Sequence, residues 1–178
     1  MIGKKDIKNL AEKIEGLKRE HRLDLSLDED LSIAVMNLIS LEEHFFFTAA
    51  KTGKQEYYGL IDKVREIRKD LMKKIVKKED GEIWCASKHL LAASMRLIEA
   101  GAKCQRKGDK DAAENMFSKA YELYSIFWGL NLGIIEMNEA KKLGGGRADK
   151  AREGRESKDD LTEKLNKLVQ DLINCCEE

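Results

Sequence analysis

The absence of proline constrains this chain more than any other feature of its sequence. Its 178 residues contain none, whereas an average chain of that length would contain about nine. Proline disrupts helix interiors and is found mostly in turns and at the edges of sheets. Its absence therefore favours long helices joined by short loops. No stretch of useful length alternates apolar and polar residues as a half-buried strand would, so we predict an all-α fold.

Apolar residues recur at three- and four-residue steps through most of the chain, as in amphipathic helices. The pattern predicts helices over residues 2–20, 28–50, 55–77, 82–106, 110–142 and 158–176. We expect residues 28–143 to form an antiparallel four-helix bundle core, with an additional amphipathic helix at each end of the chain. Residues 1–143 would then be one helical domain, with Trp84 and Trp128 at least partly in its core.

Residues 144–157 have the composition of a linker. They begin with three consecutive glycines and continue with interleaved acidic and basic residues, so little there could be buried. We expect this linker to be flexible. It would let the last helix, over residues 158–176, reach either its own bundle or a neighbouring molecule.

Local signals predict where these helices begin, end and bend. Ser26 followed by Glu29 is the pattern of a capping box, and Thr52–Gly53 should end the second helix. Gly129 and Gly133 are expected to bend the fifth helix or to let another helix approach closely. The third helix should bury one apolar face, formed by Tyr57, Leu60, Ile61, Val64, Ile67, Leu71 and Ile75.

Residues 94–127 carry a local pattern of small and aromatic residues. Gly101 stands at a small position, Gly108–Asp109 at a turn, and Ala113, Phe117 and Ala120 at spaced small and aromatic positions. This stretch resembles one hairpin of the tetratricopeptide type. The family's usual Trp and Tyr positions hold Leu97 and Cys104, and no second copy follows, so we interpret the stretch as convergent hairpin packing. The resemblance implies peptide or protein binding rather than catalysis.

The candidate metal ligands and reactive thiols form no complete motif. Cys85 and His89 lie four residues apart on one helical face, a spacing that suits metal chelation. In a bundle, however, His44 should lie at a different height from His89. We therefore favour packing roles for these residues, incidental exposed thiols at Cys175 and Cys176, and no cofactor.

Arg96 lies in an apolar stretch of the fourth helix, where an unpaired charge is expensive to remove from water. The helical rise places it level with Glu43, so we expect Arg96 to pair with Glu43 or Glu99, or to reach solvent. Polar residues also recur on one side of the second helix, and we interpret them as a solvent-facing stripe rather than a polar lane inside the bundle. They are Asn37, Ser40, His44 and Thr48.

Acidic and basic residues balance at 33 each, so no global field attracts nucleic acid or an anionic membrane. No apolar run is long enough to cross a bilayer, and residues 1–10 lack the apolar stretch of a signal peptide. We therefore expect a cytoplasmic location.

These observations together predict a non-enzymatic helical protein that binds another protein or itself. The expected contact residues form the narrow apolar stripes of the terminal helices: Ile7, Leu10, Ile14 and Leu17 in the first, and Leu161, Leu165, Leu168 and Leu172 in the last. The alternative is an RNA-associated helical domain. Its contact would be a basic row on the third helix: Arg65, Lys69, Lys73 and Lys77. A metal-binding or small-molecule enzyme is a third, less favoured interpretation.

Overall fold

The computed structural model describes residues 25–76, 81–144, 162–167, 169 and 170, together with Glu12 and Gly16. All regular structure in these ranges is α-helical and none of it is strand, which confirms the all-α prediction. The helices are α2 (Ser26–Thr52), α3 (Glu56–Ile75), α4 (Glu82–Arg106), α5 (Lys110–Asn131) and α6 (Met137–Gly144). Residues 162–167 and 169–170 are also helical and are called the C-terminal segment below.

Two stretches of the sequence prediction lie largely outside the described residues. Of the helix expected over residues 2–20, only Glu12 and Gly16 are described, and both are helical. The expected linker, residues 144–157, lies outside them from residue 145 onward.

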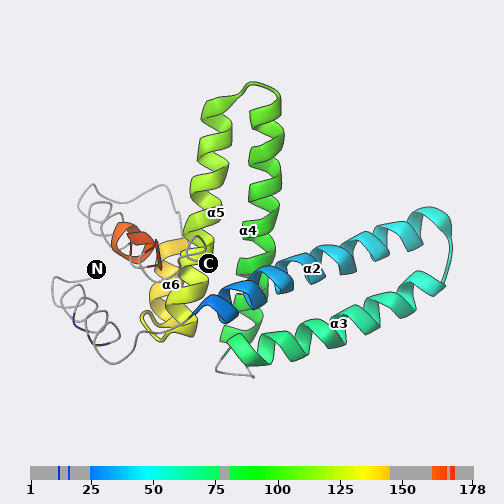
Figure 1. The fold of residues 1–178 in the computed structure, drawn as a ribbon, viewed down its shortest axis with the longest axis horizontal. Helices are drawn as coiled ribbons and strands as arrows, with labels where there is room; N and C mark the ends of the chain where they lie inside the picture. The colour runs from blue at the N-terminus through cyan, green and yellow to red at the C-terminus, as the bar shows by residue number, and fades with distance from the viewer. Residues whose placement is uncertain are drawn as a thin grey trace.

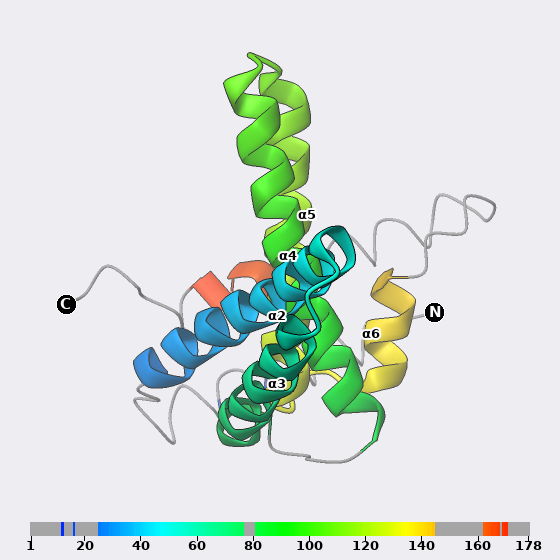
Figure 2. The same cartoon turned by 90° about the vertical axis from the view of Figure 1, so that its right-hand side faces the viewer.

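The long helices form two hairpins, which meet at one end and then diverge. α2 packs along α3, α4 packs along α5, and the hairpins touch mainly through α2 and α4. Figures 1 and 2 show that the pairs cross at a steep angle. This differs from the expected four-helix bundle, in which all four helices would lie side by side. The reason lies in α2, whose buried residues, apart from Ala49, all fall in its first half.

The start of α2 differs from the sequence prediction, whereas its end agrees with it. The helix begins at Ser26, so the N-cap position falls on Leu25, which has no side-chain capping bond. The predicted capping box from Ser26 to Glu29 is therefore wrong. Gly53 adopts a left-handed φ of 71°, and its N–H donates to the Ala49 carbonyl at 2.8 Å, which ends the helix as expected.

The single helix predicted over residues 110–142 is wrong, because the chain turns over residues 132–136 between α5 and α6. Gly133 has a φ of 69°, which few side-chain-bearing residues adopt. The backbone N–H of Ile134 donates to the Gly129 carbonyl at 2.8 Å and closes the turn. The expectation that glycine would bend this helix is confirmed.

The face that α3 buries is rotated from the one that its apolar residues predicted. Ile67 and Leu60 are exposed, whereas Arg68 and Met72 are buried. Arg68 turns inward because it pairs with Glu42 of α2. The other buried residues of α3 follow the prediction: Ile61, Val64 and Ile75.

α4 and α5 approach closely because small residues line their contact. The Gly101 backbone lies against the Phe117 ring, so a Cβ built at Gly101 would lie 2.6 Å from Phe117 Cε1. The Ser94 hydroxyl donates to the carbonyl of Ala120 at 2.8 Å, and Ala113 is buried nearer the start of α5. This contact makes α4–α5 a tight hairpin.

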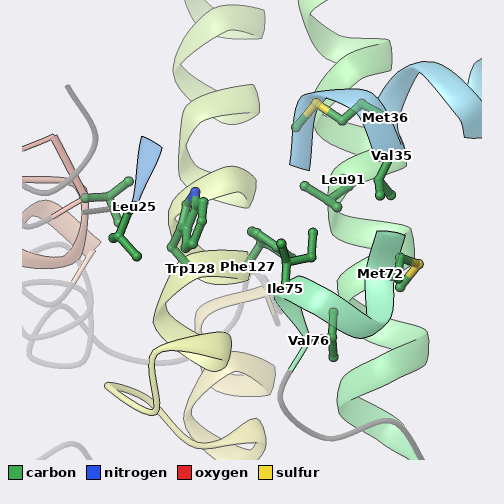
Figure 3. Close-up of a cluster of buried hydrophobic side chains, with 10 residues drawn as sticks. Leu25, Val35, Met36, Met72, Ile75, Val76, Leu91, Phe127 and Trp128 are labelled. Carbon is green, nitrogen blue, oxygen red and sulfur yellow. The ribbon is translucent and has the colours of Figure 1, made fainter. Parts of the chain in front are cut away.

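The main hydrophobic core lies where the two hairpins meet (Figure 3). It gathers buried residues from both hairpins and from the C-terminal segment: Leu25, Val35, Met36, Met72, Ile75, Val76, Leu91, Phe127, Trp128 and Val169. Trp128 is 1% exposed and Trp84 is half-buried against this cluster, so the placement predicted for both tryptophans is confirmed. A second cluster forms around the α5–α6 turn: Ile126, Leu130, Ile134, Ile135, Ala140 and Leu165.

Candidate functional site

An open groove of about 760 Å³ lies beside the second half of α2, and one residue of α4 also lines it. We call it the aromatic groove, and its lining residues are Ser40, Glu43, His44, Phe47, Thr48, Lys51, Thr52 and Arg96. Glu43 and Arg96 form an ion pair between the two helices. The pairing predicted for Arg96 is confirmed, with Glu43 as the partner.

Phe47 of this groove and the adjacent Phe46 both project their rings into solvent. Phe46 is 51% exposed and Phe47 is 59% exposed, and their ring centroids lie 5.3 Å apart in an edge-on contact. The preceding Phe45 turns toward α3, where its ring lies 6.1 Å from that of Tyr57. The exposed pair therefore forms a small apolar patch on the surface of α2.

The polar stripe predicted on α2 faces solvent, as expected. Asn37 and His44 are exposed, and Ser40 and Thr48 are half-buried. The Thr48 hydroxyl donates to the His44 carbonyl at 2.8 Å within the helix. Three of the four residues line the aromatic groove. The stripe therefore supplies the polar part of this groove.

A second hollow, of about 440 Å³, is lined by residues of α2, α3 and α4, and we call it the basic pocket. Its lining residues are Ile39, Glu42, Arg65, Arg68, Lys69, Trp84, Cys85, Lys88, His89 and Ala92. Arg68 is only 5% exposed, and its Nε donates to Glu42 Oε1 at 2.5 Å. Arg65 Nε donates to the other oxygen of the same carboxylate at 3.3 Å. One carboxylate thus serves two guanidinium groups.

The basic row that favoured RNA binding is interrupted by acidic residues on the same helix. Three of its members pair with a carboxylate three residues earlier: Arg65 with Asp62 at 3.7 Å, Lys69 with Glu66 at 2.8 Å, and Lys73 with Asp70 at 3.5 Å. The hydrogen bond and charge of Lys69 lower the pKa of the Glu66 carboxyl. Lys77 lies outside the described residues. In the described part of α3, each basic residue of the row stands beside an acidic residue of the same helix. The row therefore offers no continuous basic face there.

The C-terminal segment packs against α5 of its own chain. Leu165 and Val169 are each 1% exposed. A Cβ built at Gly129 would lie 3.0 Å from Leu165 Cδ1, so this glycine provides the close approach that the sequence predicted. The Tyr121 hydroxyl donates to the Asn166 carbonyl at 3.3 Å. Figure 1 shows the segment, in orange and red, beside α5.

Of the predicted contact residues, only Leu165 is described, and it is buried inside the molecule. It could contact a partner only if the segment left α5. The other predicted contact residues lie outside the described residues: Ile7, Leu10, Ile14, Leu17, Leu161, Leu168 and Leu172. For these residues partner binding stays a prediction.

The candidate metal ligands do not converge. Cys85 and His89 both line the basic pocket, whereas His44 lines the aromatic groove. Among the described residues, no group of three or more His, Cys, Asp or Glu side chains could hold a metal ion. Cys175 and Cys176 lie outside the described part of the chain. None of the described helices is long and apolar enough to span a bilayer.

Comparison of the chain with protein-family models, with curated proteins and with solved structures finds no match. The resemblance of residues 94–127 to a tetratricopeptide hairpin therefore stays a prediction.

The sequence contained a signal for the exposed phenylalanines that the search for motifs missed. Residues 45–47 are three consecutive phenylalanines in the middle of a helix. Because successive helical side chains point about 100° apart, three of them span about 200° of the helix surface. A helix that packs mainly on one neighbour cannot bury all three, so at least one ring must face solvent or a partner.

Proposed function

We propose that this protein is a non-enzymatic, cytoplasmic helical scaffold that binds a helix of another protein at the aromatic groove. The exposed pair Phe46 and Phe47 is the single observation that carries this proposal. Exposed aromatic rings in contact with each other are typical of recognition surfaces, and aromatic residues are enriched in protein interfaces.

The form of the groove supports a helix as the bound element. An amphipathic helix places an apolar stripe in a groove and keeps its polar face in water. At the aromatic groove, Phe47 offers the apolar contact and Ser40, His44 and Thr48 offer polar contacts beside it. A volume of about 760 Å³ has room for several side chains of such a helix.

The charges of the groove indicate the character of the partner. Glu43 and Arg96 neutralise each other through their ion pair, whereas Lys51 has no ion-pair partner in the described part of the chain. The groove therefore carries one uncompensated positive charge. A partner helix with an acidic residue beside its apolar stripe would complement it.

The test compares two double variants that each remove two exposed apolar side chains. Phe46→Gln with Phe47→Gln changes the groove, and Tyr58→Gln with Ile67→Gln changes exposed residues of α3 outside it. Partners retained from native lysate would be identified by mass spectrometry, and their affinity for the purified variants would be measured. We expect the phenylalanine variant to bind the partner at least about tenfold more weakly than the parent protein does, and the control variant to bind it with unchanged affinity.

Light scattering of each purified variant separates a foreign partner from a second copy of the chain. A fall in mass confined to the phenylalanine variant would identify the partner as another copy. Equal loss of the partner in both double variants, or no loss in either, would refute the aromatic groove as the binding site.

A further inference from the structure

We infer that the basic pocket between the two hairpins binds a small phosphorylated molecule. This site is separate from the aromatic groove and does not depend on it. The inference rests on the charges that line the pocket, on the hydrogen-bonding capacity of a buried arginine, and on the three helices that form the walls of the pocket.

The lining of the pocket carries an excess of positive charge. Four cationic side chains and one carboxylate line the pocket, and two of the cations, Arg65 and Lys69, also pair with Asp62 and Glu66 of α3 outside the lining. When these carboxylates are counted and histidine is taken as neutral, an excess of one positive charge remains. Glu42 is the one carboxylate, and two arginines share it. Lys88 has no ion-pair partner in the described part of the chain. A positive excess beside two guanidinium groups favours an anion whose oxygens can accept hydrogen bonds from both, such as a phosphomonoester or a diphosphate.

Arg68 has hydrogen-bonding capacity that its partners in the protein do not use fully. A guanidinium has five N–H donors in a planar fork that matches phosphate and carboxylate oxygens. In this structure Arg68 Nε donates to Glu42, and Nη1 lies 3.5 Å from Met72 Sδ, a weak acceptor. A buried guanidinium with such a weak second acceptor has donors left for an anion in the pocket. Arg65, at the same carboxylate, adds a second fork.

The size and walls of the pocket favour a small ligand over RNA. The pocket holds about 440 Å³ and takes its walls from α2, α3 and α4, a volume in the usual range for small-molecule sites. An RNA backbone would need a basic track that continues beyond the pocket. On α3 that track alternates with acidic residues, each paired with a member of the basic row.

The test measures anion binding by isothermal titration calorimetry on the full chain at low ionic strength. The probes are inorganic pyrophosphate, ribose 5-phosphate, succinate and a single-stranded RNA oligonucleotide. We expect both phosphorylated probes to bind, and succinate to bind at least about tenfold more weakly, because each of its carboxylates offers two oxygens to one guanidinium fork, whereas a single phosphate group offers three oxygens that both arginines can share. No binding of either phosphorylated probe, equally tight succinate, or tighter binding of RNA would overturn the inference.

A matched pair of lysine variants shows whether binding occurs in this pocket. Lys88→Gln removes a pocket charge, and Lys73→Gln removes a charge from α3 outside the pocket. Both variants change the net charge of the protein equally. We expect Lys88→Gln to lower the affinity for pyrophosphate on the order of tenfold and Lys73→Gln to change that affinity little. Equal effects would show that only the overall charge of the protein attracts the anion, which would overturn the inference.

Glu42→Gln provides an independent test with the opposite sign. It leaves Arg68 buried without its counter-ion, so the variant should melt at a lower temperature than the parent protein. Pyrophosphate would replace the missing negative charge. It should therefore bind more tightly to the variant and raise its melting temperature by more than that of the parent. If pyrophosphate left the melting temperature of the Glu42→Gln variant unchanged, the proposed site would be refuted.

Discussion

The contact between Gly101 and Phe117 predicts that adding one methyl group to α4 will weaken the α4–α5 hairpin. A Cβ at Gly101 would lie 2.6 Å from Phe117 Cε1 and 2.8 Å from Phe117 Cδ1. Carbon atoms in ordinary contact lie about 3.5–4.0 Å apart, so the ring or the helix must move by about 1 Å. Overpacking of this kind costs about 1–3 kcal/mol. Alanine also gains about 1 kcal/mol over glycine inside a helix, which offsets part of that cost.

Gly59 offers a matched control for this substitution. It lies inside α3, and a Cβ there would meet nothing within 4 Å. Gly59→Ala should therefore show the helix-propensity gain alone, a rise of about 2–4 °C in melting temperature for about 1 kcal/mol. The difference between the two variants in free energy of unfolding isolates the steric cost. We expect it to be about 1–3 kcal/mol, measured by urea unfolding.

A second background identifies the source of that cost. In a Phe117→Ala protein the ring is absent, so adding Gly101→Ala should stabilise the chain about as much as Gly59→Ala does. Equal stability of the Gly101→Ala and Gly59→Ala variants, with Phe117 in place, would refute the close contact between α4 and α5.

Three further predictions concern the ends of helices and the C-terminal segment. Burial, and to a smaller extent the charge of Asp30, raises the pKa of the Glu29 carboxyl in the native state. The native state therefore holds this proton more tightly than the unfolded chain does. The free energy of unfolding should fall as pH rises above the usual glutamate pKa. Glu29→Gln should therefore raise the melting temperature at pH 7 and have no such effect below about pH 4, as thermal melts at both pH values would show. Asp109→Ala removes the side chain that caps α5 and should lower the free energy of unfolding by about 1 kcal/mol, measured in urea. Asp109→Asn keeps a capping oxygen and should retain most of that stability. Truncation after Gly144 removes the buried Leu165 and Val169 and should lower stability by at least about 2–5 kcal/mol, and an unchanged circular-dichroism melt would show that the segment does not pack on the core.

Helix type and most helix ends could be predicted from the sequence because they depend on local features. The missing prolines, the three- and four-residue spacing of apolar residues, and the glycines at positions 53 and 133 act within a few residues of the chain. The arrangement of the helices could not be predicted in the same way. It depends on which half of α2 is buried, and that is decided by contacts with Leu91 and Phe127, far along the chain.

The candidate sites were predictable in part. The level of Arg96 on its helix was sufficient to find Glu43, because both helices are regular and the ion pair needs only equal height. Arg68 could not be predicted as buried. Its neighbours Ile67 and Leu71 are apolar and predicted the opposite face, and only the Glu42 carboxylate explains why the guanidinium turns inward. Pairing between distant residues overrides apolar periodicity at this position.

Two adjacent carboxylates of α2 connect the proposed sites. Glu42 contacts arginines of α3 in the basic pocket, whereas Glu43 contacts Arg96 of α4 at the aromatic groove. Each hollow takes residues from both hairpins, so a molecule bound in either one contacts both and favours one angle between them. Linkage then requires that a phosphorylated ligand change the affinity for the partner helix by the same factor as the partner changes the affinity for the ligand. Two binding titrations, each repeated with the other site saturated, measure both factors. A common factor of one would show that the occupants of the two hollows do not act on each other, and a loss of affinity that grows without limit as the second molecule is added would show that they compete for one site.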